Sequence, residues 1–150
     1  MAELLGDSSL GRHGIELGDR SGFLANAELM QTDMTNSRLP DPEILGERFP
    51  VLVEAHAIRR GSGGAGRWRG GDGALRCIRF FEPMAASMLS HDRGVPPFGL
   101  AGGEPGSLGR NRVECADGMR DALAGCATVE VQPADVFVIE TPDGGGYGVF

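Results

Sequence analysis

Glycine is the residue type that most constrains how this chain can fold. It supplies 25 of the 150 residues, well above the usual share of about 7%. The densest run, residues 61–73, holds seven glycines, and residues 94–109 and 144–148 are also rich in glycine. Because glycine weakens the interior of both helices and strands, these runs are expected to be long loops. Regular structure must therefore lie between them.

The segments between the glycine runs show the two-residue period of β-strands. From position 51 to 58, Val51, Val53, Ala55 and Ala57 alternate with a mixed set of residues and are expected to share one face. The pair Asp117 and Gly118 is typical of a tight hairpin turn. Residues 136–139 are all apolar, as in a strand that is buried on both faces. Further strands are predicted at residues 74–82, 85–90, 112–115, 119–123 and 127–132.

One short helix is predicted at residues 41–47. Asp41 can cap it, Pro42 suits the first helical position, and Pro50 ends the segment. The expected fold is mainly β, sandwich-like or barrel-like, with six or seven short strands, one short helix and long glycine-rich loops. An α+β fold is the alternative. Residues 1–30 show no lasting period and are expected to form an irregular or mobile leader, whereas residues 31–150 are expected to form the β-rich domain.

Composition excludes several classes of function. Lysine is absent, so the chain has neither a phosphate-binding P-loop lysine nor a Schiff-base lysine. The net charge of −7 argues against non-specific nucleic-acid binding. No apolar run is long enough to span a membrane, and no signal peptide is visible, so a cytoplasmic location is expected. The three cysteines are widely spaced, and neither a disulfide framework nor a metal site is predicted.

Residues 61–66 match the pattern G-x-G-x-x-G, which has two possible meanings. A dinucleotide site would need a helix directly after the loop, but the glycines at positions 70 and 71 make a poor helix start, so none is expected. Alternatively, the backbone N–H groups of Gly63 and Gly64 could form an anion-binding nest beside Arg59 and Arg67. The loop could also use these glycines for tight turns only, with its arginines paired to acidic neighbours.

Several segments carry a resemblance to a known family. In order and spacing, residues 34–148 resemble the C-terminal region of the hydantoinase B/5-oxoprolinase family. Asp33, Ala134 and Asp143 depart from the family pattern, in which histidine is usual at the first position and glycine at the other two. The matching segments are residues 34–38, 41–43, 48–51, 59–73, 96–106 and 140–148.

The resemblance implies a part in the ATP-dependent opening of a cyclic amide such as 5-oxoproline. ATP and a divalent metal are then implied for the larger parent enzyme, with no cofactor in this chain. The chain would support the site without being catalytic alone, and its partners would be upstream domains or subunits and further copies of itself. The alternative is a stand-alone, non-catalytic module for binding or dimerisation.

The resemblance and the residue patterns together give a short set of candidate contacts. Asn36 is expected to orient the substrate, and Arg59 or Arg67 to hold a carboxylate. Backbone N–H groups of Gly63 and Gly64 are expected to add donors. Tyr147, the only tyrosine, is held between glycines and is the candidate interface residue.

Overall fold

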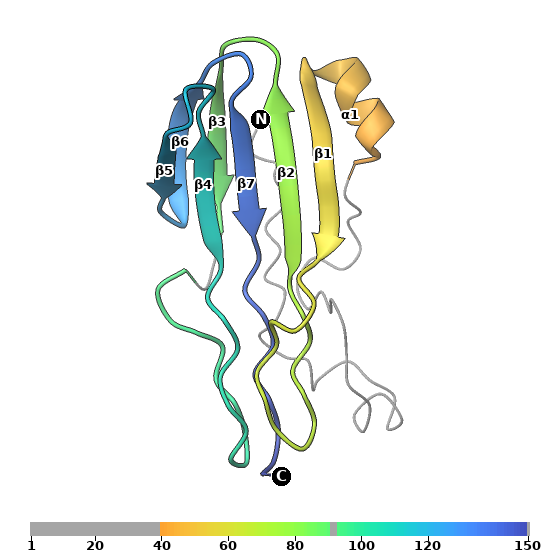
Figure 1. Cartoon of the computed structure of the whole chain (residues 1–150), viewed down its shortest axis with the longest axis vertical. Coiled ribbons are helices and arrows are strands. Elements are labelled where there is room, and N and C mark those ends of the chain that lie inside the picture. The colour runs from red at the N-terminus through yellow and green to blue at the C-terminus, as the bar shows by residue number, and fades with distance from the viewer. Residues whose placement is uncertain (1–39, 91–92, 150) are drawn as a thin grey trace.

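The computed structural model describes residues 40–90 and 93–149. These residues form one short helix and two antiparallel sheets (Figure 1). The predicted mainly β fold is confirmed. The elements are α1 (Pro42–Arg48), β1 (Val51–Ile58), β2 (Ala74–Phe80), β3 (Met84–Leu89), β4 (Arg110–Glu114), β5 (Arg120–Leu123), β6 (Cys126–Val131) and β7 (Val136–Glu140).

The helix forms where its capping residues predicted it. The carboxylate of Asp41 accepts a hydrogen bond from the backbone N–H of Glu43 at 2.9 Å. Pro42 occupies the first turn, where a missing N–H costs nothing. Leu45 is the buried residue of the helix and attaches it to the core. α1 therefore covers the edge of the sheet beside β1.

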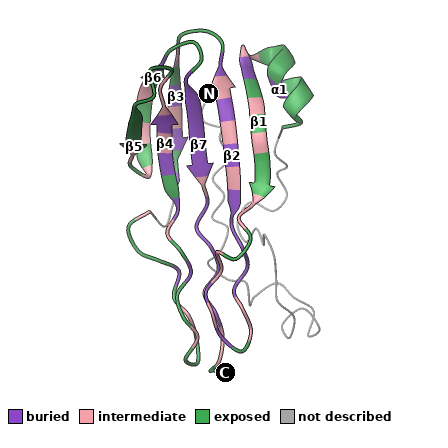
Figure 2. Ribbon diagram, viewed as in Figure 1, coloured by how far each residue is buried: buried purple, intermediate pink, exposed green. Residues whose placement is uncertain are grey.

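The larger sheet has five strands in the order β1-β2-β7-β4-β5. β7 lies at its centre, between β2 and β4, and its residues from Val136 to Ile139 are buried (Figure 2). This confirms the prediction of a strand buried on both faces. The hairpin predicted at Asp117 and Gly118 joins β4 to β5, and Gly118 adopts the left-handed conformation that such a turn requires (φ 89°).

The smaller sheet, β3 paired with β6, covers one face of the larger sheet. Between the two layers lie the largest buried side chains, among them Phe137, Ile78 and Val131. The arrangement is a sandwich, and no barrel closes among the described residues.

Arg76 shares the inner face of β2 with Ile78. It is only 6% exposed, and its Nε and Nη1 atoms have no hydrogen-bond partner.

The alternation predicted for β1 is wrong beyond its first half. The register of β1 against β2 shifts between Val53 and Ala55, which places a bulge at Glu54. Val51 and Val53 face the core as predicted, but Ala55 lies opposite Cys77, on the outer face. Because a bulge adds one residue to a strand, it exchanges the two faces of everything that follows. Ala55 therefore lies on the outer face because of the bulge, although the sequence pattern alone places it with Val51 and Val53.

The glycine-rich segments extend below the sandwich as one layered body, here called the glycine lobe (residues 59–73, 93–109 and 141–149; Figure 1). These are the long loops that the sequence predicts. The lobe continues from the ends of β1, β2, β4 and β7, so the central sheet fixes its position. The predicted leader, residues 1–30, lies outside the described residues, as do Asp33 and Asn36.

Candidate functional site

The glycine lobe is held together by direct contact between backbones. A Cβ atom added to Gly70 would overlap with the carbonyl oxygen of Gly144, and one added to Gly146 would overlap with that of Ala65. Hydrogen bonds join the same segments: Gly64 donates to the carbonyl of Gly144 at 2.9 Å. Glycine is needed at these positions because the neighbouring backbone fills the space of a side chain.

The glycine loop at residues 61–66 binds a carboxylate of the same chain, as in the alternative in which its arginines pair with acidic neighbours. The backbone N–H groups of Gly61 and Gly63 donate to the two carboxylate oxygens of Asp72, each at 2.9 Å. Nη2 of Arg69 donates to the same carboxylate at 2.9 Å. Burial alone raises the pKa of Asp72, but these donors outweigh it and hold the pKa below its ordinary value. The loop thus closes around an internal ion pair.

Arg59 is likewise engaged within the chain. Its Nη1 donates to the carbonyl oxygen of Thr141 at 2.6 Å and lies 3.4 Å from the Asp143 carboxylate. Its Nη2 lies 3.6 Å from the carboxylate of Glu140. Asp143 is 1% exposed, and its Oδ2 has no hydrogen-bond partner. Burial therefore raises the pKa of Asp143, although Arg59 and nearby donors oppose this effect.

The remaining candidate residues are spread over the lobe. Arg67 is exposed, and its guanidinium lies 5.5 Å from the centroid of the Trp68 ring. Tyr147 joins three segments, because it pairs as an isolated bridge with both Trp68 and Leu100. The N–H groups of Gly63 and Gly64 are already used inside the chain. Contacts of these residues with a substrate or a partner stay predictions.

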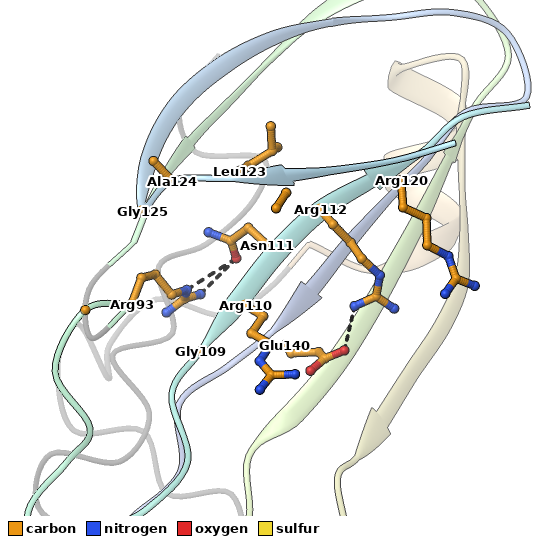
Figure 3. Close-up of a pocket in the computed structure, with 12 residues that line it drawn as sticks. Arg93, Gly109, Arg110, Asn111, Arg112, Arg120, Leu123, Ala124, Gly125 and Glu140 are labelled. Atoms are coloured by element: carbon orange, nitrogen blue, oxygen red, sulfur yellow. Dashed lines mark hydrogen bonds and ion pairs between the residues drawn. The ribbon is translucent and has the colours of Figure 1, made fainter. Parts of the chain in front are cut away.

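A second group of polar residues surrounds a hollow of about 750 Å³ at the β4–β5 end of the larger sheet (Figure 3). Arg110 and Arg112 lie two residues apart on β4, and Arg120 lies on β5. Arg93 reaches the hollow from the glycine lobe and donates to the Oδ1 atom of Asn111 at 3.1 Å. Four arginines therefore meet in one hollow.

Two carboxylates compensate part of this positive charge. Glu140 of β7 accepts from Nη1 of Arg112 at 2.6 Å and is also the register neighbour of Arg110. Glu114 accepts from Nε of Arg112 at 3.0 Å and lies 3.3 Å from Nε of Arg120. Arg110 is exposed and forms no ion pair with any residue that the structure describes.

Sequence reasoning missed this hollow. The signal was present in the alternation of Arg110 and Arg112 along a single strand, which places both side chains on one face. The strand order could not be predicted from the sequence, and it is the strand order that brings Glu140 beside these arginines from a distant segment.

Within residues 40–90 and 93–149, no group of three His, Cys, Asp or Glu side chains could hold a metal ion. Cys77, Cys115 and Cys126 are free.

Comparison with known proteins decides the family. Residues 19–149 match the family model described as hydantoinase B/oxoprolinase. The chain belongs to this family. The Gly-rich segments that carried the resemblance at the sequence level lie within the matched span.

Relatives of this hydantoinase B/oxoprolinase chain include 5-oxoprolinase 1 of Arabidopsis thaliana, which is 44% identical over 119 residues, or 79% of this chain. The 5-oxoprolinase of Dictyostelium discoideum is 36% identical over 149 residues, or 95% of this chain. These matches cover 9% and 12% of the two relatives. The chain thus spans about a tenth of the length of these curated relatives.

Solved structures share the fold of this family member. The ATP-dependent caprolactamase from Pseudomonas jessenii superposes on it with a TM-score of 0.63 at 24% identity, over 73% of this chain and 20% of that one. An acetone carboxylase gives a TM-score of 0.62 at 19% identity, over 83% of this chain and 21% of that one.

In the part of the hydantoinase B/oxoprolinase chain that the structure describes, no helix is long and apolar enough to cross a membrane.

Proposed function

We propose that this chain is the β-rich, site-supporting part of an ATP-dependent cyclic-amide hydrolase of the 5-oxoprolinase kind, and that it is not catalytic alone. The observation that carries the proposal is its 36–44% identity to 5-oxoprolinases over most of its length, although it spans only about a tenth of theirs. A cyclic amide with a carboxylate, such as 5-oxoproline, is the proposed substrate of the whole enzyme.

The chemistry of the glycine lobe supports a positioning role. Its buried carboxylates, Asp72 and Asp143, face arginines and backbone N–H groups of the same chain. Their interactions therefore hold the segments of the lobe together. Arg67 differs, since it is exposed and contacts the Trp68 ring. A guanidinium held over an aromatic ring keeps free N–H groups at its edge, and these can hold a carboxylate. Arg67 is therefore the proposed substrate contact of this chain.

ATP and a divalent metal belong to the proposed enzyme, but the described residues of this chain do not fit the metal. A divalent metal needs several free oxygen ligands, whereas the carboxylates of Asp72 and Glu140 are already paired with arginine. The proposal places both groups in parts of the enzyme outside this chain. The part of the chain that the structure describes would contribute walls and orientation, and no metal-dependent step.

A chimera tests this function. Residues 19–149 would replace the matching segment of the Arabidopsis 5-oxoprolinase, and 5-oxoproline-dependent ATP hydrolysis would be measured for the chimera and for the purified chain alone. We expect turnover by the chimera and none by the chain. Turnover by the chain alone would overturn the supporting role, and an inactive but folded chimera would overturn the 5-oxoprolinase assignment.

The same chimera tests Arg67. Replacing Arg67 by Gln removes the charge but keeps a long polar side chain, so we expect the KM for 5-oxoproline to rise by about tenfold or more with little change in kcat. Arg48, at the exposed end of α1, is the matched control, and Arg48→Gln should leave both constants unchanged. Equal KM values for the two variants would remove Arg67 from the site.

A further inference from the structure

The arginine hollow at the β4–β5 end has a local charge opposite to that of the whole chain. Three guanidinium groups, those of Arg110, Arg112 and Arg120, lie with two carboxylates on the outer face of the larger sheet, whereas the chain as a whole carries −7. The carboxylates are Glu114 and Glu140, and each of them is shared between arginines. Arg110 is therefore left without a partner carboxylate among the described residues.

The shape of the hollow follows from small residues beside the large ones. The register partner of Arg112 on β5 is Ala122, whose side chain is a single methyl group. Ala124 and Gly125, which also have small or no side chains, line the hollow next to Ala122 (Figure 3). Long arginine side chains on one strand and alanines on its neighbour leave space above the sheet. Because the backbone stays paired beneath it, the hollow is built on a rigid base.

The position of Arg93 depends on another small residue. A Cβ added to Gly109 would press against the guanidinium of Arg93, which donates to Asn111. Asn111 is itself 3% exposed and donates to the hydroxyl of Ser90 at 2.9 Å. A buried chain of hydrogen bonds thus anchors one wall of the hollow. Arg93 is thereby held in place beside the hollow.

We propose that the hollow binds a phosphate group. Several guanidinium groups around one hollow suit a phosphate, which carries about −1.5 to −2 at neutral pH and offers three acceptor oxygens, better than they suit a single carboxylate. Arg110 is the principal donor, because it has no ion pair among the described residues. Arg112 and Arg120 add N–H groups that Glu114 and Glu140 leave unused. A volume of about 750 Å³ admits free phosphate as well as a small phosphate ester.

This site is separate from the proposed substrate contact at Arg67 and does not rest on the proposed function. The whole chain would be titrated with inorganic phosphate at low ionic strength and followed by calorimetry. Glycerol phosphate and acetate would be titrated in parallel. We expect saturable binding of inorganic phosphate, and acetate should bind at least about tenfold more weakly. Tighter binding of glycerol phosphate than of inorganic phosphate would identify an ester as the ligand, and the reverse order would identify free phosphate.

Three variants locate the site. Arg110→Gln should weaken phosphate binding by about tenfold, which corresponds to about 1.4 kcal/mol, and Arg48→Gln should not change it. Ala122→Glu places a carboxylate in the hollow and should abolish binding while the β-sheet signal in circular dichroism is kept. The proposal fails if phosphate does not saturate, if acetate binds equally well, or if Arg110→Gln and Arg48→Gln bind alike.

Discussion

At the scale of single residues, Asp72 and Asp143 are both buried in the glycine lobe, yet their surroundings move their pKa values in opposite directions. Asp72 accepts two backbone N–H groups and one guanidinium, which together outweigh the cost of its burial. Asp143 faces Arg59 at 3.4 Å, but one of its oxygens has no donor. Burial is the largest influence on the pKa of Asp143 and outweighs Arg59 and the nearby donors, whereas the donors around Asp72 outweigh its burial.

The raised pKa of Asp143 predicts how stability depends on pH. Because the folded chain holds this proton more tightly than the unfolded chain, the contribution of Asp143 is fully present below its unfolded pKa. That contribution is lost as pH rises through the raised, folded pKa. The lowered pKa of Asp72 acts oppositely: its contribution is present above the unfolded pKa and is lost as pH falls through the folded one.

Asp143→Asn separates these two effects. The substitution keeps the size of the side chain and removes its charge, so the midpoint of thermal unfolding at neutral pH should rise above that of the natural chain. The loss of stability between mildly acidic and neutral pH should also become smaller. Asp121→Asn, on the exposed strand β5, is the control and should change neither quantity. A lower midpoint for Asp143→Asn would mean that the ion pair with Arg59 dominates.

At the scale of elements, the predictions that succeeded rest on local chemistry. The cap at Asp41, the turn at Gly118 and the apolar run of β7 each depend on residues close in sequence. The bulge at Glu54 could not be predicted in this way, since β1 alternates without interruption and the shift shows only against β2. Arg76 likewise occupies an inner position of β2 that its strand pattern alone would assign to an apolar residue.

The turn between β6 and β7 contains a strained residue. Ala134 has φ 74°, in the left-handed region where a Cβ is unfavourable by about 1 kcal/mol. The neighbouring carboxylate of Asp135 holds the turn, because it accepts from the N–H groups of Gln132 and Ala116. These bonds compensate for the strain at Ala134. Glycine would adopt the same conformation without this strain.

Ala134→Gly should therefore stabilise the chain by up to about 1 kcal/mol in the free energy of unfolding, measured by urea denaturation. Ala116→Gly is the matched change, because φ of Ala116 is not in the left-handed region. It should destabilise the chain by about 0.5 kcal/mol through the greater freedom of the unfolded state. Equal effects of the two substitutions would show that strain at Ala134 is negligible.

At the scale of the whole molecule, the structure combines two kinds of packing. The sandwich buries side chains such as Phe137 between its layers, whereas the glycine lobe packs backbone against backbone. The sequence predicts that the lobe segments are loops. It could not predict that they join one another or that Asp72 binds in the glycine loop, because these contacts link residues far apart in the chain. The arginine hollow was missed for the same reason.

Gly70→Ala should disrupt the lobe and spare the sandwich. The added methyl group would overlap with the carbonyl of Gly144, at an expected cost of at least about 2 kcal/mol. Amide hydrogen exchange should then become fast at Gly64 and Gly146 and stay slow in β7. Gly94→Ala is the control, because a Cβ at this position would meet no described atom within 4 Å apart from its chain neighbours. Uniform acceleration across both parts would show that lobe and sandwich unfold as one unit.

The central place of β7 also bears on the order of events during protein synthesis. β7 and the segment after it follow all other strands in sequence, yet β7 joins β2 to β4, and residues 141–149 run through the middle of the lobe. While a growing chain on the ribosome lacks Val136, its β1–β2 and β4–β5 hairpins have no strand between them. The larger sheet can therefore close only after β7 has left the exit tunnel, because both hairpins pair with this strand.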